Sequence, residues 1–152
     1  MNLTKKQIEI RSDPAKFVRN ICNQFQTKYK IIPPTSTAWR PTGDKANDKL
    51  NQELFRNWLR EDKGISINGC SCSPDYGVYL YSLCDGHDIL YSVGGDKAQK
   101  KADDKYFYFS IIDRMKHYPA KWHLIFYWIS LTRWVAVSTF GRWLRFGRYY
   151  NG

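Results

Sequence analysis

Apolar and polar positions in the first half of the chain alternate with the period of an α-helix. After Asp13 and Pro14, apolar side chains recur every three or four residues, and polar side chains occupy the opposite face. The apolar positions are Phe17, Val18, Ile21, Cys22 and Phe25. Asp13 can cap the free N–H groups of a first turn, and proline suits the first helical position. The pattern predicts a helix beginning near residues 12–14, with Cys22 as a buried core thiol.

A second helix is predicted between Asp44 and Gly64. The proline pair at 33–34 breaks the first helix, because proline lacks a donor N–H and favours extended geometry in the residue before it. The apolar face of the second helix is formed by Leu50, Leu54, Phe55, Trp58 and Leu59. Asp44 is a candidate N-cap, and Lys63 followed by Gly64 is typical of a helix end.

After Gly64 the pattern favours β-strands. Residues 65–67 are short and extended, and residues 76–83 are aromatic and β-branched with an alternating pattern. Residues 84–88 are turn-like, and residues 89–93 complete a predicted hairpin. We interpret the polar stretch 94–105 as a loop.

Two further apolar segments follow. Residues 106–112 have the strongest strand character in the chain. Residues 122–140 form a nearly continuous apolar stretch whose composition favours strands, although 122–131 fits a buried helix equally well. We therefore expect an α+β fold in a single domain spanning 1–152. Its helical part covers 12–63, and its mainly antiparallel β part covers 65–152.

Charge indicates the kind of partner. The chain has 24 Lys and Arg residues against 14 Asp and Glu, a formal net charge of +10. Residues 106–152 contain seven of these basic residues and a single acid, Asp113. Nucleic acid, an anionic membrane surface and an acidic protein are the partners that such a charge attracts.

The C-terminal region interleaves arginines with aromatic residues. Guanidinium groups pair with phosphates, and aromatic rings stack on unpaired bases. The sequence therefore predicts an RNA or single-stranded DNA interface in this region. Its candidate contacts are Lys121, Arg133, Arg142, Trp143, Arg145, Phe146, Arg148 and Tyr149.

We expect no cofactor, and zinc is the one candidate that the cysteines suggest. Three sulfurs and one imidazole can form a closed tetrahedral zinc site. The candidate ligands are Cys70, Cys72, Cys84 and His87. The Cys-x-Cys half is tighter than the usual zinc knuckle, so ordinary residues flanking a hairpin are the competing interpretation.

Two weak patterns could support a nuclease. Asp75 followed later by Asp103 and Lys105 has the residue types of a metal-dependent centre, in which carboxylates hold Mg²⁺ and a lysine orients water. Alternatively, His117 with Arg114 and Lys116 could cleave RNA without a metal. The spacing of the first pattern is loose, and the second set also describes a plain basic surface.

Membrane insertion is not expected. Residues 122–140 approach the length of a membrane helix, but Arg133 inside the segment would cost about 2.5–3.5 kcal/mol. A segment lying on the membrane surface is the more plausible membrane alternative. The polar start of the chain does not resemble a signal peptide. We therefore expect a cytoplasmic or otherwise intracellular protein whose cysteines are reduced or metal-bound.

The leading hypothesis is a binding protein rather than an enzyme, with RNA or single-stranded DNA as its ligand. The first alternative is a protein-interaction or inhibitor module, for example one encoded by a mobile element, whose aromatic residues anchor an interface. The second alternative is a small nuclease.

Overall fold

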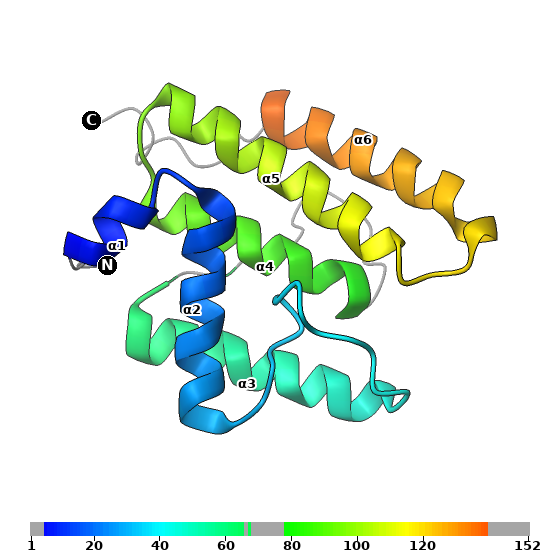
Figure 1. Cartoon of the computed structure of the whole chain (residues 1–152), viewed down its shortest axis with the longest axis horizontal. Helices are drawn as coiled ribbons and strands as arrows, with labels where there is room; N and C mark the ends of the chain where they lie inside the picture. Colours follow the sequence, from blue (N-terminus) through cyan, green and yellow to red (C-terminus); the bar gives the residue numbers. More distant parts are fainter. Residues whose placement is uncertain (1–4, 66, 68–77, 140–152) are drawn as a thin grey trace.

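All regular secondary structure in the described part of the chain is helical. The computed structural model describes residues 5–65, 67 and 78–139, and Figure 1 shows how they are arranged. The elements are α1 (Lys5–Ile10), α2 (Pro14–Tyr29), α3 (Lys45–Lys63), α4 (Val78–Val93), α5 (Lys97–Met115), the 3₁₀ turn η1 (Ala120–Trp122) and α6 (His123–Thr139). Helix α4 lies between α2 and α3 on one side and α5 on the other, and α6 runs alongside α5 at the edge of the molecule.

The expected α+β fold is therefore wrong. The described residues contain no strand: 78–83, the predicted turn 84–88 and the predicted returning strand 89–93 form one continuous helix, α4. The predicted loop 94–105 and strand 106–112 mostly belong to α5. Residues 123–139 form α6, so the helical alternative for 122–131 holds from residue 123 and the strand expectation for the rest of the stretch up to 139 is wrong.

The wrong prediction of a hairpin over the residues of α4 has a physical cause. Every described residue from 82 to 92 is buried, so the helix has no solvent-facing polar stripe. The periodicity that identifies an amphipathic helix is absent from such a segment. In α5, Asp96 caps the N-terminus by accepting a hydrogen bond from the backbone N–H of Gln99. Burial of Phe107 and Ile111, one helical turn apart, outweighs the strand preference of the aromatic run.

The two predicted helices are confirmed as α2 and α3 together with their caps, whereas α1 was not predicted. Asp13 accepts a hydrogen bond from the N–H of Lys16, and Asp44 accepts one from the N–H of Asn47. Gly64 ends α3 at a φ of 63°, a left-handed conformation that glycine adopts without strain. Leu50 differs from the prediction, because 68% of its surface is exposed.

Two apolar clusters stabilise the helices. The first joins α2, α3 and the C-terminal half of α4, and its aromatic centre is formed by Phe25, Phe55 and Trp58. The second joins α4, α5 and α6 around Leu83, Ile111 and Ile129. Among the described helices, none combines the length and the apolar character that crossing a bilayer requires.

Candidate functional site

Two acidic side chains buried on α4 and α5, Asp85 and Asp103, are paired with arginines from other parts of the fold. Asp85 of α4 accepts two hydrogen bonds from Arg56 of α3, at 2.7 and 2.9 Å, and a third from Gln52. Burial raises the pKa of Asp85 to about 6, although Arg56 acts in the opposite direction. This group ties α3 to α4.

Asp103, a candidate metal ligand of the nuclease hypothesis, is fully buried in α5. Both of its carboxylate oxygens accept hydrogen bonds from Arg11, at 2.7 and 3.0 Å. Arg11 also donates to the carbonyl oxygens of Leu90 and Gly94, so one guanidinium joins the α1–α2 connection to α4 and α5. Lys105 is exposed on the same helix. The Asp-x-Lys triplet thus lies within a helix, and its aspartate is engaged by an arginine.

His87, a candidate zinc ligand, belongs to a cluster centred on Asp104. The carboxylate of Asp104 lies 2.9 Å from Nε2 of His87, 2.6 Å from Nζ of Lys100 and 2.5 Å from the hydroxyl of Tyr91. Burial by itself would raise the pKa of Asp104, but the hydrogen bonds from these neighbours hold it below its usual value. His87 therefore contributes to the contact between α4 and α5.

Arg114, considered above for metal-independent RNA cleavage, is 94% buried. It donates to the hydroxyl of Ser82 and to the carbonyl oxygens of Pro34 and Ser36. Burial lowers the pKa of Arg114 to about 10. His117 and Lys116 are exposed just beyond the end of α5. The three candidate residues therefore do not form one accessible cluster.

Arg133 and Cys84 meet at the contact between α6 and α4. Nη1 of Arg133 lies 2.8 Å from Sγ of Cys84, and Arg133 exposes only 3% of its surface. Its guanidinium is thus placed away from solvent, whereas the sequence-based hypothesis had it contacting phosphate. Cys84 is disulfide-bonded, which differs from the expected reduced or metal-bound thiol. Cys22 is a free, buried thiol as predicted, and burial raises its pKa to about 12.

Several predicted site residues lie outside the described residues: Asp75, Cys70, Cys72, Arg142, Trp143, Arg145, Phe146, Arg148 and Tyr149. Lys121 is described and exposed, with its ammonium 5.6 Å from the ring centre of Trp122. Within residues 5–65, 67 and 78–139, no group of three or more His, Cys, Asp or Glu side chains is arranged to hold a metal ion.

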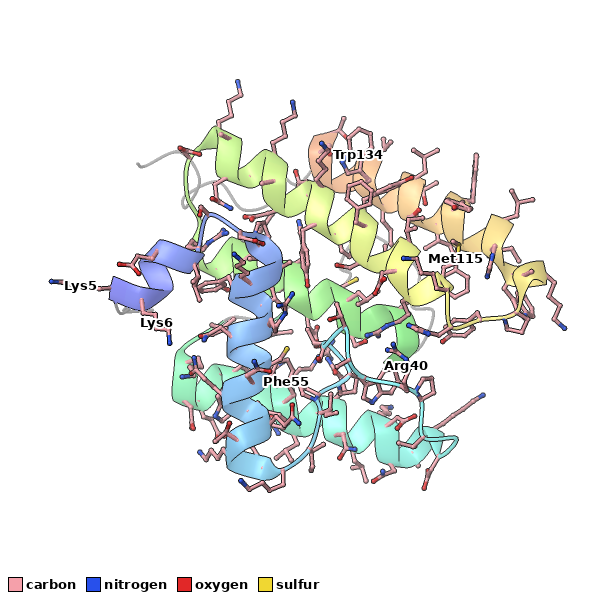
Figure 2. The ribbon with its side chains drawn as sticks, viewed as in Figure 1. Lys5, Lys6, Arg40, Phe55, Met115 and Trp134 are labelled. Atoms are coloured by element: carbon pink, nitrogen blue, oxygen red, sulfur yellow. The ribbon has the colours of Figure 1, made fainter. Side chains whose placement is uncertain are left out.

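A cationic pocket lies between α5 and the C-terminal end of α6. It encloses about 300 Å³ and is lined by Lys97, Lys100, Lys101, Asp104, Lys105, Trp134 and Ser138. Figure 2 shows Trp134 near the end of α6, on the side toward the N-terminal half of α5. The indole also packs edge-on against Tyr108 of α5, with ring centres 6.4 Å apart. The pocket thus combines several ammonium groups with one partly exposed aromatic ring.

The charge of this pocket is positive on balance. Lys97, Lys101 and Lys105 recur every four residues and are exposed, so they form a row along α5 with a rise of about 6 Å between neighbours. Among the described lining residues Asp104 is the one acid, and Lys100 neutralises it at 2.6 Å. The N-terminus of α5 adds the positive end of its helix dipole near Lys97. An anionic group would be attracted to this row.

The pocket does not follow from the predicted elements, because the polar composition of residues 94–105 indicates a loop. A signal was nevertheless present: lysines at 97, 101 and 105 have the four-residue spacing of one helical face, and Asp96 precedes them as a possible cap.

Comparison with known proteins found no match: no family model fits the sequence, and neither the curated proteins nor the solved structures include a similar chain. The candidate function consequently rests on the residues of this chain alone.

Proposed function

We propose that this protein binds single-stranded nucleic acid, RNA or single-stranded DNA, at the lysine-lined pocket between α5 and α6. The observation that carries the proposal is the placement of Trp134 beside the lysine row within one cavity of about 300 Å³. Phosphates need cations, and unpaired bases need a flat ring on which to stack. Both requirements are met by neighbouring side chains here.

The geometry of the row supports a strand rather than a lone phosphate. Lys97, Lys101 and Lys105 are separated by one turn each, so successive ammonium groups can follow successive phosphates along a backbone. Trp134 exposes 38% of its surface, which leaves part of the indole accessible to a base. Its contact with Tyr108 holds the ring in position before a ligand arrives.

The test measures fluorescence anisotropy of a labelled single-stranded oligonucleotide, as RNA and as DNA, at several salt concentrations. Replacing Lys97, Lys101 and Lys105 together with glutamine should weaken binding by about 10- to 100-fold. The same change should make the slope of log affinity against log salt shallower by about 2, since each phosphate contact on a single strand contributes about 0.7.

A matched control removes the same charge elsewhere. Lys6, Lys45 and Lys49 are exposed on α1 and α3, and their triple glutamine variant lowers the net charge equally. It should retain nearly all of the affinity. Equal losses in the two triple variants would show diffuse attraction to a basic protein, and no binding by the native chain would refute the proposal.

Trp134→Leu tests the stacking component. Leucine keeps an apolar side chain near Tyr108 but offers no ring. Because a base–aromatic stack is worth about 1–3 kcal/mol, affinity should fall by about 5- to 100-fold while the salt slope stays unchanged. A loss accompanied by a changed slope would indicate that the substitution disturbs the lysine row instead.

A further inference from the structure

The outer face of α6 is apolar and uncovered. Leu124 exposes 79% of its surface, Trp128 68%, Leu131 44% and Val135 46%. The opposite face of the same helix is buried and includes Phe126, which belongs to the second apolar cluster. A water-soluble monomer rarely exposes a contiguous apolar surface of this kind, and such a surface usually marks an interaction site.

The spacing of these four residues is that of a helix-pairing seam. Leu124, Trp128, Leu131 and Val135 follow one another at intervals of four, three and four residues, the pattern of alternating d and a positions in a heptad. At 1.5 Å per residue the seam is about 16 Å long. These four side chains can pack as knobs into the holes of a facing helix.

Within α6, the residues that flank the seam carry no charge. Ile125 and Thr132 border it on one side, and Tyr127 and Trp134 border it on the other. Helices that lie on membranes usually carry Lys or Arg on their polar face. The one Lys or Arg of α6 is Arg133, which is buried against Cys84. These features favour a protein helix over a lipid surface as the occupant.

We propose that the occupant is a second copy of this chain, paired through α6 in antiparallel orientation about a two-fold axis. The seam is symmetric about the point between residues 129 and 130. An antiparallel partner therefore places Leu124 opposite Val135 of the other copy, and Trp128 opposite Leu131. Each layer joins a larger side chain to a smaller one, and the same patch serves both copies, as a closed two-fold interface requires.

The available area is compatible with a stable dimer. Tyr127 and Trp128 expose 48% and 68% of their surfaces, about 250 Å² in total. Leu124, Leu131 and their aliphatic neighbours extend this toward the roughly 800 Å² per partner of a standard interface.

Charge shapes the behaviour of this dimer. Each copy carries a net charge of +10, so two copies repel one another at a distance although their seam is neutral. Added salt screens the repulsion, and association should tighten as salt rises from 50 to about 500 mM. Nucleic-acid binding should respond in the opposite direction, and the two proposals can therefore fail independently.

The experiment is sedimentation equilibrium of the full chain, freed of nucleic acid, over a range of protein and salt concentrations. The native chain should show a reversible monomer–dimer equilibrium. Leu131→Lys, which places a charge at the centre of the seam, should raise the dissociation constant at least 10-fold. Leu50→Lys is the matched control, because Leu50 is an exposed leucine on α3, away from the seam. This substitution should leave the dimer unchanged.

A mixing experiment distinguishes loss of the dimer contact from loss of folding caused by the substitution. Leu131→Lys and Leu131→Glu should each be monomeric, whereas an equimolar mixture should recover dimer, because the two 131 positions lie diagonally across the two-fold axis in adjacent layers and opposite charges there attract. A monomeric native chain at all concentrations would overturn the proposal, as would equal effects of the two lysine variants. Binding of the monomeric native chain to phosphatidylglycerol vesicles, lost in Leu131→Lys, would overturn it in favour of a membrane surface.

Discussion

The contact between α2 and α3 and the surroundings of α4 are both buried, but different forces hold them. Phe25, Phe55 and Trp58 fill the first with rings at centre distances of 5.0–5.9 Å. Around α4, Asp85 and Ser82 meet arginines from α3 and α5, and Asp104 meets Lys100 of its own helix. The α2–α3 contact is stabilised by apolar burial, whereas the surroundings of α4 depend on hydrogen bonds and ion pairs between buried polar groups.

This difference explains why the sequence pattern predicts α2 and α3 correctly but not α4. On α2 and α3, most polar side chains face solvent, so the polar pattern marks the outside of each helix. On α4, polar side chains such as Ser82 and Asp88 are buried, and the same pattern indicates the inside. A sequence pattern alone cannot distinguish a polar residue that faces water from one that faces an arginine.

The largest effect is expected from breaking one pair beside α4. Asp85→Ala leaves the guanidinium of Arg56 buried without this carboxylate and should lower the free energy of unfolding by about 3–5 kcal/mol at pH 7. The double variant Arg56→Met with Asp85→Leu replaces the pair with apolar groups and should recover much of this loss. Urea unfolding followed by circular dichroism measures both. A double variant no more stable than Asp85→Ala would mean that the polar layer cannot be exchanged for an apolar one.

A smaller effect comes from pH, again through Asp85. Its folded-state pKa of about 6 exceeds the value of about 3.9 in an unfolded chain, so the folded state binds this proton more tightly. The stability contributed by this group is fully present below about pH 4 and is lost as pH rises through 6. The advantage of the native chain over Asp85→Asn in unfolding free energy should shrink by about 2–3 kcal/mol between pH 4 and 7. An advantage that grows with pH would show that Arg56, rather than burial, controls the pKa.

The smallest effect is expected from removing helix caps. The comparison is between α2, which the sequence predicts, and α5, which it does not. Asp13→Ala removes the cap of α2, and Asp96→Ala removes the cap of α5. Each should cost about 1 kcal/mol in unfolding free energy, since both carboxylates accept a hydrogen bond from a first-turn N–H. Thermal unfolding of the two variants against the native chain would check this. A negligible cost at Asp96 alone would indicate that tertiary contacts, rather than its cap, fix the start of α5.

The candidate site was predictable only in part. The sequence predicts cations beside aromatic rings in the C-terminal region, but Arg133 of that region is buried. The row formed by Lys97, Lys101 and Lys105 lies in a segment that was predicted to be a loop. Trp134 was seen as a strand residue, and only the packing of α6 on α5 places it beside those lysines. Among the described nuclease and zinc candidates, Asp103 pairs with Arg11 and His87 with Asp104. Lys105 and His117 are exposed.

The sequence by itself determined the helices α2 and α3, because caps, helix ends and apolar periodicity are local properties encoded within each segment. It also determined the charge that limits the choice of partners. The tertiary structure decided the state of residues 78–115, since burial on all sides removes the periodic signal and the strand preference of an aromatic run yields to packing. It also decided which cations face water and which are bound to a buried acid, because that depends on residues as far apart in the chain as Arg11 and Asp103.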